Sequence, residues 1–220
     1  MTDSYLILQL IENEDNNQEI FQKLNRLLDD SKFRENKYKF RSLLYLLIKI
    51  ADNYHRSPTF FNQIEIILNL FKTEIQKYFS NSEIFRIFKT NKRILLFLIE
   101  EKILIIDQNI AQKILNIPNE KAKYPQYFYP EIEPFISDKT KIRFDNENES
   151  KTHSNSIQLP QNFHENRKNG ENEKEICKLI RNDSIEDFII YVNQKNIPLS
   201  SSIKSSIFET NSYLYENQQP

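Results

Sequence analysis

Residues 171–197, ENEKEICKLIRNDSIEDFIIYVNQKNI, predict two short amphipathic helices joined by a polar turn. The apolar positions of the first helix are Ile176, Leu179 and Ile180. Those of the second helix recur at i, i+3, i+4 and i+7, and they are Ile185, Phe188, Ile189 and Val192. The polar turn is expected to end the first helix and to cap the second through Asn182, Asp183 and Ser184.

Such a pair cannot bury its apolar stripe by itself. Each helix spans about ten residues, below the roughly 12–15 residues at which isolated helices become marginal in water. The pair therefore needs a neighbour on its apolar face, as the units of repeat proteins do. We expect this face to bind a protein partner through Ile185, Phe188, Ile189 and Val192.

Glycine usage excludes several classes of protein. Gly170 is the single glycine among 220 residues. Phosphate-binding loops, dinucleotide-binding motifs and nucleophile elbows need several glycines, because their backbones adopt positive φ or approach a ligand closely. Tight hairpins of the Asn-Gly type are excluded for the same reason. This composition weighs against nucleotide enzymes and β-rich folds, and it favours an all-α fold.

Cysteine, charge and hydropathy limit the cellular context. A single cysteine, Cys177, excludes an internal disulfide and fits a reducing compartment. The chain has 30 basic and 31 acidic residues, so no global positive field attracts polyanions. The N-terminus lacks the basic region of a signal peptide, and the longest apolar run, residues 94–99, is far shorter than the roughly 20 residues that span a bilayer. We expect a soluble protein of the cytoplasm or nucleus with no membrane partner.

The N-terminal half has helical periodicity throughout. The expected helices cover residues 4–13, 17–30, 37–53, 58–80, 83–88, 93–101 and 108–115. The strongest pattern is that of residues 37–53, whose expected core residues are Phe40, Leu43, Leu44, Leu47, Ile48 and Ala51. Residues 124–135, YPQYFYPEIEPF, cannot form one long helix because of their prolines. Their aromatic rings are expected to cover the helical core, with presentation to a partner as the alternative.

Composition divides the chain into three parts. Residues 137–162 are rich in Asn, Ser and charged residues, and we expect them to form a flexible linker because they cannot bury a core. The predicted organisation is a solenoid-like helical domain over 1–136, this linker, and the helix pair with its flanks over 163–220. Gly170 is expected to end a short helix over residues 163–168, and residues 206–214 are weakly helical.

The sequence pattern of the helix pair also occurs earlier in the chain. Residues 83–99 read EIFRIFKTNKRILLFLI, and residues 175–190 read EICKLIRNDSIEDFII. With one residue inserted in the turn, both segments follow the same order of acidic, apolar, basic and turn positions. This repetition predicts recurring helix–turn–helix packing of the solenoid type. The alternative is that a compositionally biased sequence repeats its favoured combinations.

No constellation of residues indicates catalysis. The possible metal or Cys–His ligands lack the short spacing of structural zinc sites, and they are His55, His153, His164 and Cys177. Cys177 lies on an amphipathic helix, where cysteine is usually a small core residue. Adjacent acidic residues point about 100° apart on a helix and do not converge on a substrate. We therefore expect a protein without enzymatic activity, cofactor or metal.

A basic and aromatic segment gives an alternative function. Residues 32–41, KFRENKYKFR, interleave basic residues with aromatic rings, a combination that binds phosphate and stacks bases. An RNA- or DNA-binding domain would use Lys32, Arg34, Lys37, Lys39 and Arg41. The other interpretation is a solvated helix start whose aromatic rings point inward.

Three segments of the chain resemble a known family. They are residues 43–68, LLYLLIKIADNYHRSPTFFNQIEIIL, residues 91–103, NKRILLFLIEEKI, and residues 176–214, ICKLIRNDSIEDFIIYVNQKNIPLSSSIKSSIFETNSYL. They resemble the N-terminal region of a large family of ankyrin-repeat proteins from parasitic, trichomonad-type protists. The resemblance implies protein–protein interaction and a helix pair that leads into ankyrin repeats. No T-P-L-H-x-A-like phrase follows Leu214, so we expect the leading domain without its array, and the family supplies no site motif.

Overall fold

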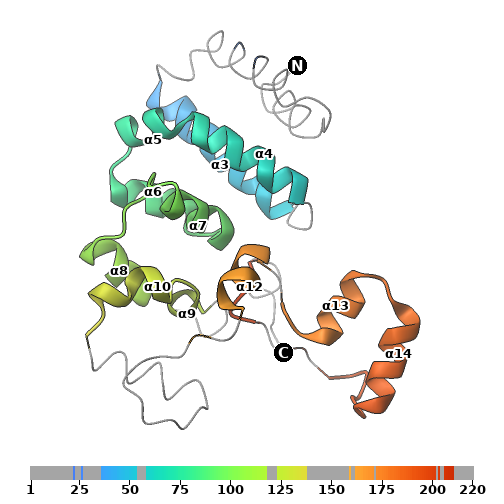
Figure 1. The fold of residues 1–220 in the computed structure, drawn as a ribbon. Helices are drawn as coiled ribbons and strands as arrows, with labels where there is room; N and C mark the ends of the chain where they lie inside the picture. The colour runs from blue at the N-terminus through green and yellow to red at the C-terminus, as the bar shows by residue number, and fades with distance from the viewer. Residues whose placement is uncertain are drawn as a thin grey trace. The chain divides into compact units, whose positions relative to one another are not determined.

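A computed structural model describes residues 22, 26, 36–53, 58–117, 123–137, 159, 162–170, 172–201, 203 and 206–210 of the chain. These residues form eleven α-helices and one short 3-10 helix, and no strand occurs among them. The predicted all-α class is therefore confirmed for the described residues (Figure 1). The predicted helices over residues 4–13 and 17–30 lie outside them, apart from Gln22 and Arg26, which are helical.

The chain forms two compact units, Met1–Ile110 and Ala111–Pro220. The predicted division into residues 1–136, 137–162 and 163–220 stays a prediction. Of the expected linker, the structure describes residues 137, 159 and 162.

Helix α3 of the first unit spans Lys37–Asn53, the range that its periodicity predicts. Its start is capped by the Asn36 side chain, which accepts hydrogen bonds from the backbone N–H groups of Tyr38 (3.0 Å) and Lys39 (3.1 Å). All six expected core residues are buried, and Ile50 joins them. The apolar stripe of α3 is thus the core face of this unit.

The helix predicted over residues 58–80 is interrupted, and this prediction is corrected. The structure has α4 over Pro58–Leu70 and α5 over Lys72–Tyr78, with a break at Phe71 (φ −91°, ψ 7°). The Phe71 ring is buried and packs edge-on against the Phe40 ring, with 5.2 Å between their centroids. The helix breaks at the residue whose ring makes this long-range contact, and sequence periodicity cannot predict such a contact.

Helix α6 spans Asn81–Phe88, α7 spans Lys92–Glu100 and α8 spans Gln108–Leu115. Ser80 and Glu83 form a capping box at the start of α6, which the sequence reading missed. The Asp107 side chain accepts a hydrogen bond from Ile110 N–H at 2.8 Å and so caps the start of α8. Four of the six residues in the apolar run 94–99 are buried, and Phe97 and Ile99 are half-buried.

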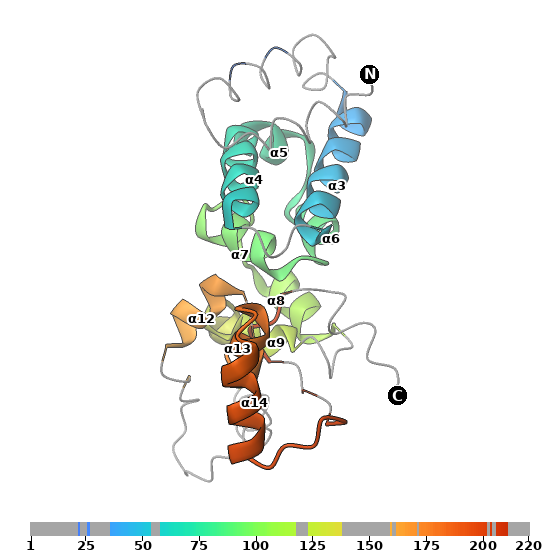
Figure 2. The ribbon, with the colours of Figure 1, turned by 90° about the vertical axis from the view of Figure 1, so that its right-hand side faces the viewer.

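Two helix pairs stack within the first unit. Figure 2 shows α3 above α6 and α4 above α7. Side chains join the pairs at three places: Arg41 of α3 pairs with Glu83 at 2.8 Å, Asn91 donates to Asp52 at 2.8 Å, and Arg93 lies 3.9 Å from the centre of the Phe61 ring. The two helix pairs are therefore joined by an ion pair, a hydrogen bond and a cation–π contact.

The second unit contains the Pro/aromatic segment, which forms three short helical turns. They are α9 (Tyr124–Tyr127), α10 (Tyr129–Ile132) and the 3-10 helix η2 (Glu133–Phe135). The expectation that no long helix forms here is confirmed. The aromatic side chains at four positions are buried, and they are Tyr124, Tyr127, Phe128 and Tyr129. Their burial supports the covering role over presentation to a partner.

Helix α12 spans Phe163–Asn169 and ends at Gly170, which adopts φ +70° as predicted. The Gly170 carbonyl accepts hydrogen bonds from the N–H and the hydroxyl of Thr210, at 3.1 and 2.8 Å. A Cβ at position 170 would lie 2.9 Å from the Thr210 hydroxyl oxygen. Residues 206–210 contain a turn and no helix, so the weak helix predicted from residue 206 is wrong for these five residues.

Three other helices also end at a residue with positive φ, although that residue is not glycine. In α7 the N–H of Ile103 bonds back to Leu98 O at 2.8 Å, and Lys102 between them has φ +55°. This is the Schellman arrangement, in which a left-handed residue closes the helix and glycine is favoured. The same arrangement ends α13 at Asp183 and α14 at Asn196. In this chain, which has a single glycine, Lys102, Asp183 and Asn196 occupy the left-handed positions that glycine would favour.

Candidate functional site

The helix pair predicted from residues 171–197 is present as α13 (Glu175–Arg181) and α14 (Ile185–Gln194). The two helices pack against each other and are joined by a tight turn (Figure 1). Within the turn, Ser184 N–H bonds to Leu179 O at 3.0 Å, and Asp183 has φ +53°. Ser184 holds the N-cap position, but its side chain makes no capping hydrogen bond, which corrects its expected role.

The four predicted partner-binding residues divide between two environments. Val192 is buried and Phe188 is half-buried. Ile185 and Ile189 are 63% and 53% exposed. One half of the predicted stripe thus packs within the unit, and the other half faces solvent.

Exposed apolar side chains concentrate on this part of the chain. Of the eight large hydrophobic residues that are exposed among the described residues, five lie between positions 180 and 199. They are Ile180, Ile185, Ile189, Ile190 and Leu199. Single exposed hydrophobic residues are ordinary, whereas a local group of them is typical of an interaction surface.

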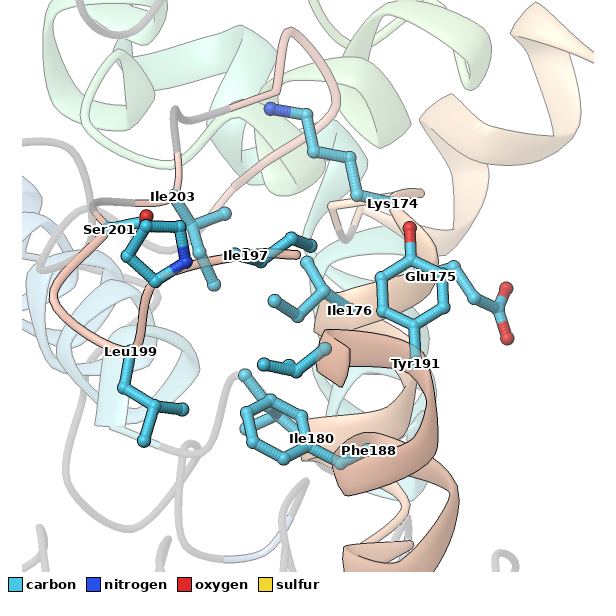
Figure 3. A pocket seen from close by; sticks show the side chains of 12 residues that line it. Lys174, Glu175, Ile176, Ile180, Phe188, Tyr191, Ile197, Leu199, Ser201 and Ile203 are labelled. Carbon is cyan, nitrogen blue, oxygen red and sulfur yellow. The ribbon is translucent and has the colours of Figure 1, made fainter. Parts of the chain in front are cut away.

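A pocket of about 620 Å³ opens between the helix pair and the segment that follows it (Figure 3). Its lining is mainly aliphatic and aromatic, with a few polar groups. The lining residues are Lys174, Glu175, Ile176, Ile180, Phe188, Tyr191, Val192, Ile197, Pro198, Leu199, Ser201 and Ile203. In Figure 3 the Phe188 ring and Ile180 lie together, and Leu199 and Ile203 come from the opposite side.

The sequence reading missed the segment after α14 as part of this site. Residues 198–206 are rich in serine and have no helical periodicity, yet Ile197, Leu199 and Ile203 line the pocket. The segment begins with a turn, in which the Ser201 N–H bonds to Pro198 O at 2.9 Å, so no regular sequence period marks these apolar residues. Ile197 is further fixed by its N–H, which bonds to Val192 O at 3.0 Å.

The repeated pattern allows the α13–α14 site to be compared with an earlier copy of the pattern, whose apolar residues are buried. The segments 83–99 and 175–190 form α6–α7 and α13–α14, each a helix–turn–helix. Ile94 and Leu98 of α7, which correspond to Ile185 and Ile189 of α14, are 1% and 0% exposed. Phe88 of α6 is buried, whereas its counterpart Ile180 is exposed. The same pattern is therefore buried in one copy and open to solvent in the other.

The basic residues proposed for nucleic-acid binding are not gathered on a free surface. Lys32 and Arg34 lie outside the described residues, and Lys39 is exposed. Arg41 and Lys37 both pair with Glu83 Oε1, at 2.8 and 3.4 Å. Their cationic groups also lie 5.2 and 5.3 Å from the centre of the Phe79 ring. Two of the five residues are thus engaged in holding α3 to the start of α6.

The pKa of the Glu83 carboxyl lies well below the ordinary value for glutamate. Hydrogen bonds from the Ser80 backbone N–H and hydroxyl, together with the Lys37 ammonium, lower the pKa of Glu83 from 4.5 to about 2. The Ser80 N–H donates at 3.0 Å and is the largest contribution. This carboxylate is therefore a fixed negative charge at the junction of α3 and α6.

The possible nucleophile and metal ligands remain dispersed where the structure describes them. Burial raises the pKa of the Cys177 thiol, which opposes formation of the thiolate that a nucleophile needs. His164 is exposed at the surface of α12, while His55 and His153 lie outside the described residues. Within the described ranges, no three His, Cys, Asp or Glu side chains are placed to bind a metal ion.

No family model, no curated protein sequence and no solved structure matches this chain. None of the helices in the described ranges has the length and apolar character needed to cross a bilayer.

Proposed function

We propose that this protein is a non-enzymatic protein-interaction module whose binding surface is the α13–α14 pair with the segment that follows it. The observation that supports this most strongly is the contrast between the two copies of the repeated pattern. In α6–α7 the apolar positions Ile94 and Leu98 are buried, and in α13–α14 the corresponding isoleucines are solvent-exposed. These side chains are 52–63% exposed, so covering each of them gains roughly half of the 1.5–3 kcal/mol that full burial of such a side chain is worth.

The proposal includes the wider context that the sequence suggests. The stacking of α3–α4 on α6–α7 supports recurring helix-pair packing of the solenoid type. The relationship to the ankyrin-repeat proteins of parasitic protists is proposed from the resemblance of the three quoted segments. A cytoplasmic or nuclear location is proposed from the single cysteine, which fits a reducing compartment.

The experiment compares protein capture by three forms of the full chain. The forms are the wild type, the double variant Ile185→Asp/Ile189→Asp, and the control Tyr45→Asp, which changes an exposed residue of α3. Circular dichroism establishes that all three have the same helix content. Each immobilised form is incubated with native lysate, half of which is treated with nuclease.

The proposal predicts specific polypeptides that are retained by the wild type and by Tyr45→Asp and lost from the double variant, with or without nuclease. A set of captured polypeptides that does not change in the double variant would contradict it. Capture that disappears after nuclease treatment would contradict it as well, and would favour the basic segment over residues 32–41.

A further inference from the structure

Helix α14 carries apolar side chains on two sides. On one side, Phe188 and Val192 pack within the unit and line the pocket. The other side carries Ile185, Ile189 and Ile190, which are 63%, 53% and 52% exposed. Apolar surface on both sides is typical of a helix that is covered on both sides. The exposed side of α14 therefore requires an occupant that is separate from the pocket.

The exposed side of α14 has nearly the same character when it is read in either direction. Positions 186, 189, 190 and 193 lie on one side of a helix with 3.6 residues per turn, and they are symmetric about the midpoint between 189 and 190. Ile189 and Ile190 form the centre, and Glu186 and Asn193, both exposed, lie at the two ends. When two such faces meet antiparallel, isoleucine lies against isoleucine, and each carboxylate lies against an amide that can donate to it.

The charges of the helix pair also favour a second copy over a strongly acidic or basic partner. Residues 174–195 have no net charge, because four basic side chains balance four acidic ones, and these are Lys174, Lys178, Arg181 and Lys195 against Glu175, Asp183, Glu186 and Asp187. Within α14 the acidic residues lie in the first turn, and Lys195 follows the last residue. Two antiparallel copies of α14 therefore place each acidic end beside a basic end, and their helix dipoles are opposed.

We propose that the exposed side of α14 binds a second copy of this chain, with the two α14 helices antiparallel and a two-fold axis between Ile189 and Ile190. This inference rests on the proposed interaction function and names the partner of that surface. Such a contact uses the same surface on both copies, so assembly stops at the dimer. Each copy contributes one side of a ten-residue helix, which is a small interface, so the dimer is weak and its population depends on concentration.

The first experiment is sedimentation equilibrium of the purified full chain over a dilution series. We expect the molar mass to rise toward that of a dimer as the concentration increases. Ile189→Asp should weaken association by more than about tenfold, because it places two like charges beside the axis. Tyr45→Asp, which introduces the same charge at an exposed position of α3, should leave the association constant within about twofold.

Disulfide trapping tests the orientation of the two helices, in chains that carry Cys177→Ser so that no other thiol reacts. In the antiparallel pair Glu186 lies opposite Asn193 of the other copy. The two Glu186 positions are about 10 Å apart along the helix axis, seven residues at 1.5 Å each, which exceeds the reach of a disulfide. A mixture of Glu186→Cys and size-tagged Asn193→Cys should therefore crosslink as a heterodimer, and Glu186→Cys alone should not.

Three results would overturn the inference. A wild-type chain that remains monomeric at about 1 mM would exclude a second copy as the occupant. Association that is equally strong in Ile189→Asp would place the contact on another surface, and efficient crosslinking of Glu186→Cys with itself would contradict the antiparallel arrangement. Capture of other polypeptides from lysate by a monomeric wild type would leave the proposed function supported, so the failure of one proposal is distinguishable from the failure of the other.

Discussion

Arg167 of α12 offers the sharpest test of how the second unit is held together. Its side chain is 5% exposed, and its guanidinium forms two hydrogen bonds to Glu131 of α10, at 2.7 and 2.8 Å. It also donates to the Tyr127 carbonyl at 3.2 Å, and the Tyr127 hydroxyl donates back to Arg167 O at 3.1 Å. The rings of Tyr127 and Phe163 lie 5.9 and 5.4 Å from the guanidinium carbon.

Replacing Glu131 by alanine leaves this guanidinium buried without its counter-ion. Such a loss costs about 3–5 kcal/mol, a large fraction of the stability of a small domain. Replacing both partners by apolar residues of similar size, Arg167→Met with Glu131→Leu, removes the buried charge together with its partner. We expect that double variant to lie within about 1–2 kcal/mol of the wild type.

The assay is urea unfolding, monitored by hydrogen exchange in peptides from α10 and α12. A global signal would combine the unfolding of the two compact units, whereas these peptides report on the second unit alone. Lys168→Ala, an exposed neighbour on α12, is the matched control and should change stability by less than about 0.5 kcal/mol. A cost below about 1 kcal/mol for Glu131→Ala would refute the reasoning. So would a double variant that is as unstable as the single one.

Further predictions follow from the first unit and from its comparison with the second. Leu98→Ala should destabilise the protein by about 2–5 kcal/mol, because Leu98 is fully buried. Ile189→Ala, at the exposed counterpart, should change stability by less than about 0.5 kcal/mol. Equal losses of stability in thermal unfolding would contradict the difference in burial between the two positions. Lys102→Gly should stabilise the protein by about 0.5–1 kcal/mol in urea unfolding, because glycine adopts the left-handed conformation at φ +55° without strain, and a destabilised variant would exclude this cause. The pKa of Glu83 is lowered from 4.5 to about 2 in the folded chain, so its contribution to stability is present above about pH 4.5 and is lost as the pH falls toward 2. Glu83→Gln should flatten that part of the dependence of the urea midpoint on pH, and an unaltered profile would contradict the assignment.

Local patterns in the sequence predict the helices well. The apolar periodicity gives both ends of α3, and the polar turns give α6–α7 and α13–α14 close to their observed bounds. Gly170 marks the end of α12 because the left-handed conformation there favours glycine. These features depend on residues within one or two turns of each other, which is the range that periodicity and capping describe.

Features that depend on distant contacts were not predictable. The break at Phe71 accompanies packing on Phe40, thirty-one positions earlier in the chain. The pairing of Arg167 with Glu131 joins two helices that the predicted organisation placed in separate domains. No pattern within either segment reports such a partner, since long-range pairing leaves no period in the sequence.

The candidate site was predictable in part for the same reason. The sequence identified the stripe of α14, but periodicity describes one face and does not say what covers it. The structure shows Val192 buried and Ile189 exposed, and it adds Leu199 from the following segment. Which half of an amphipathic stripe remains open depends on the neighbours that pack against it.

The central claim is that the α13–α14 surface binds a protein partner, and site-specific photo-crosslinking tests it most directly. A photoreactive amino acid replaces Ile189 in the full chain, and in a parallel form it replaces Tyr45, an exposed position on α3. Both forms are irradiated in native lysate, and the products are identified by mass spectrometry. The account predicts discrete protein adducts at position 189 that are absent at position 45. Identical adducts at both positions, or none at position 189, would contradict it.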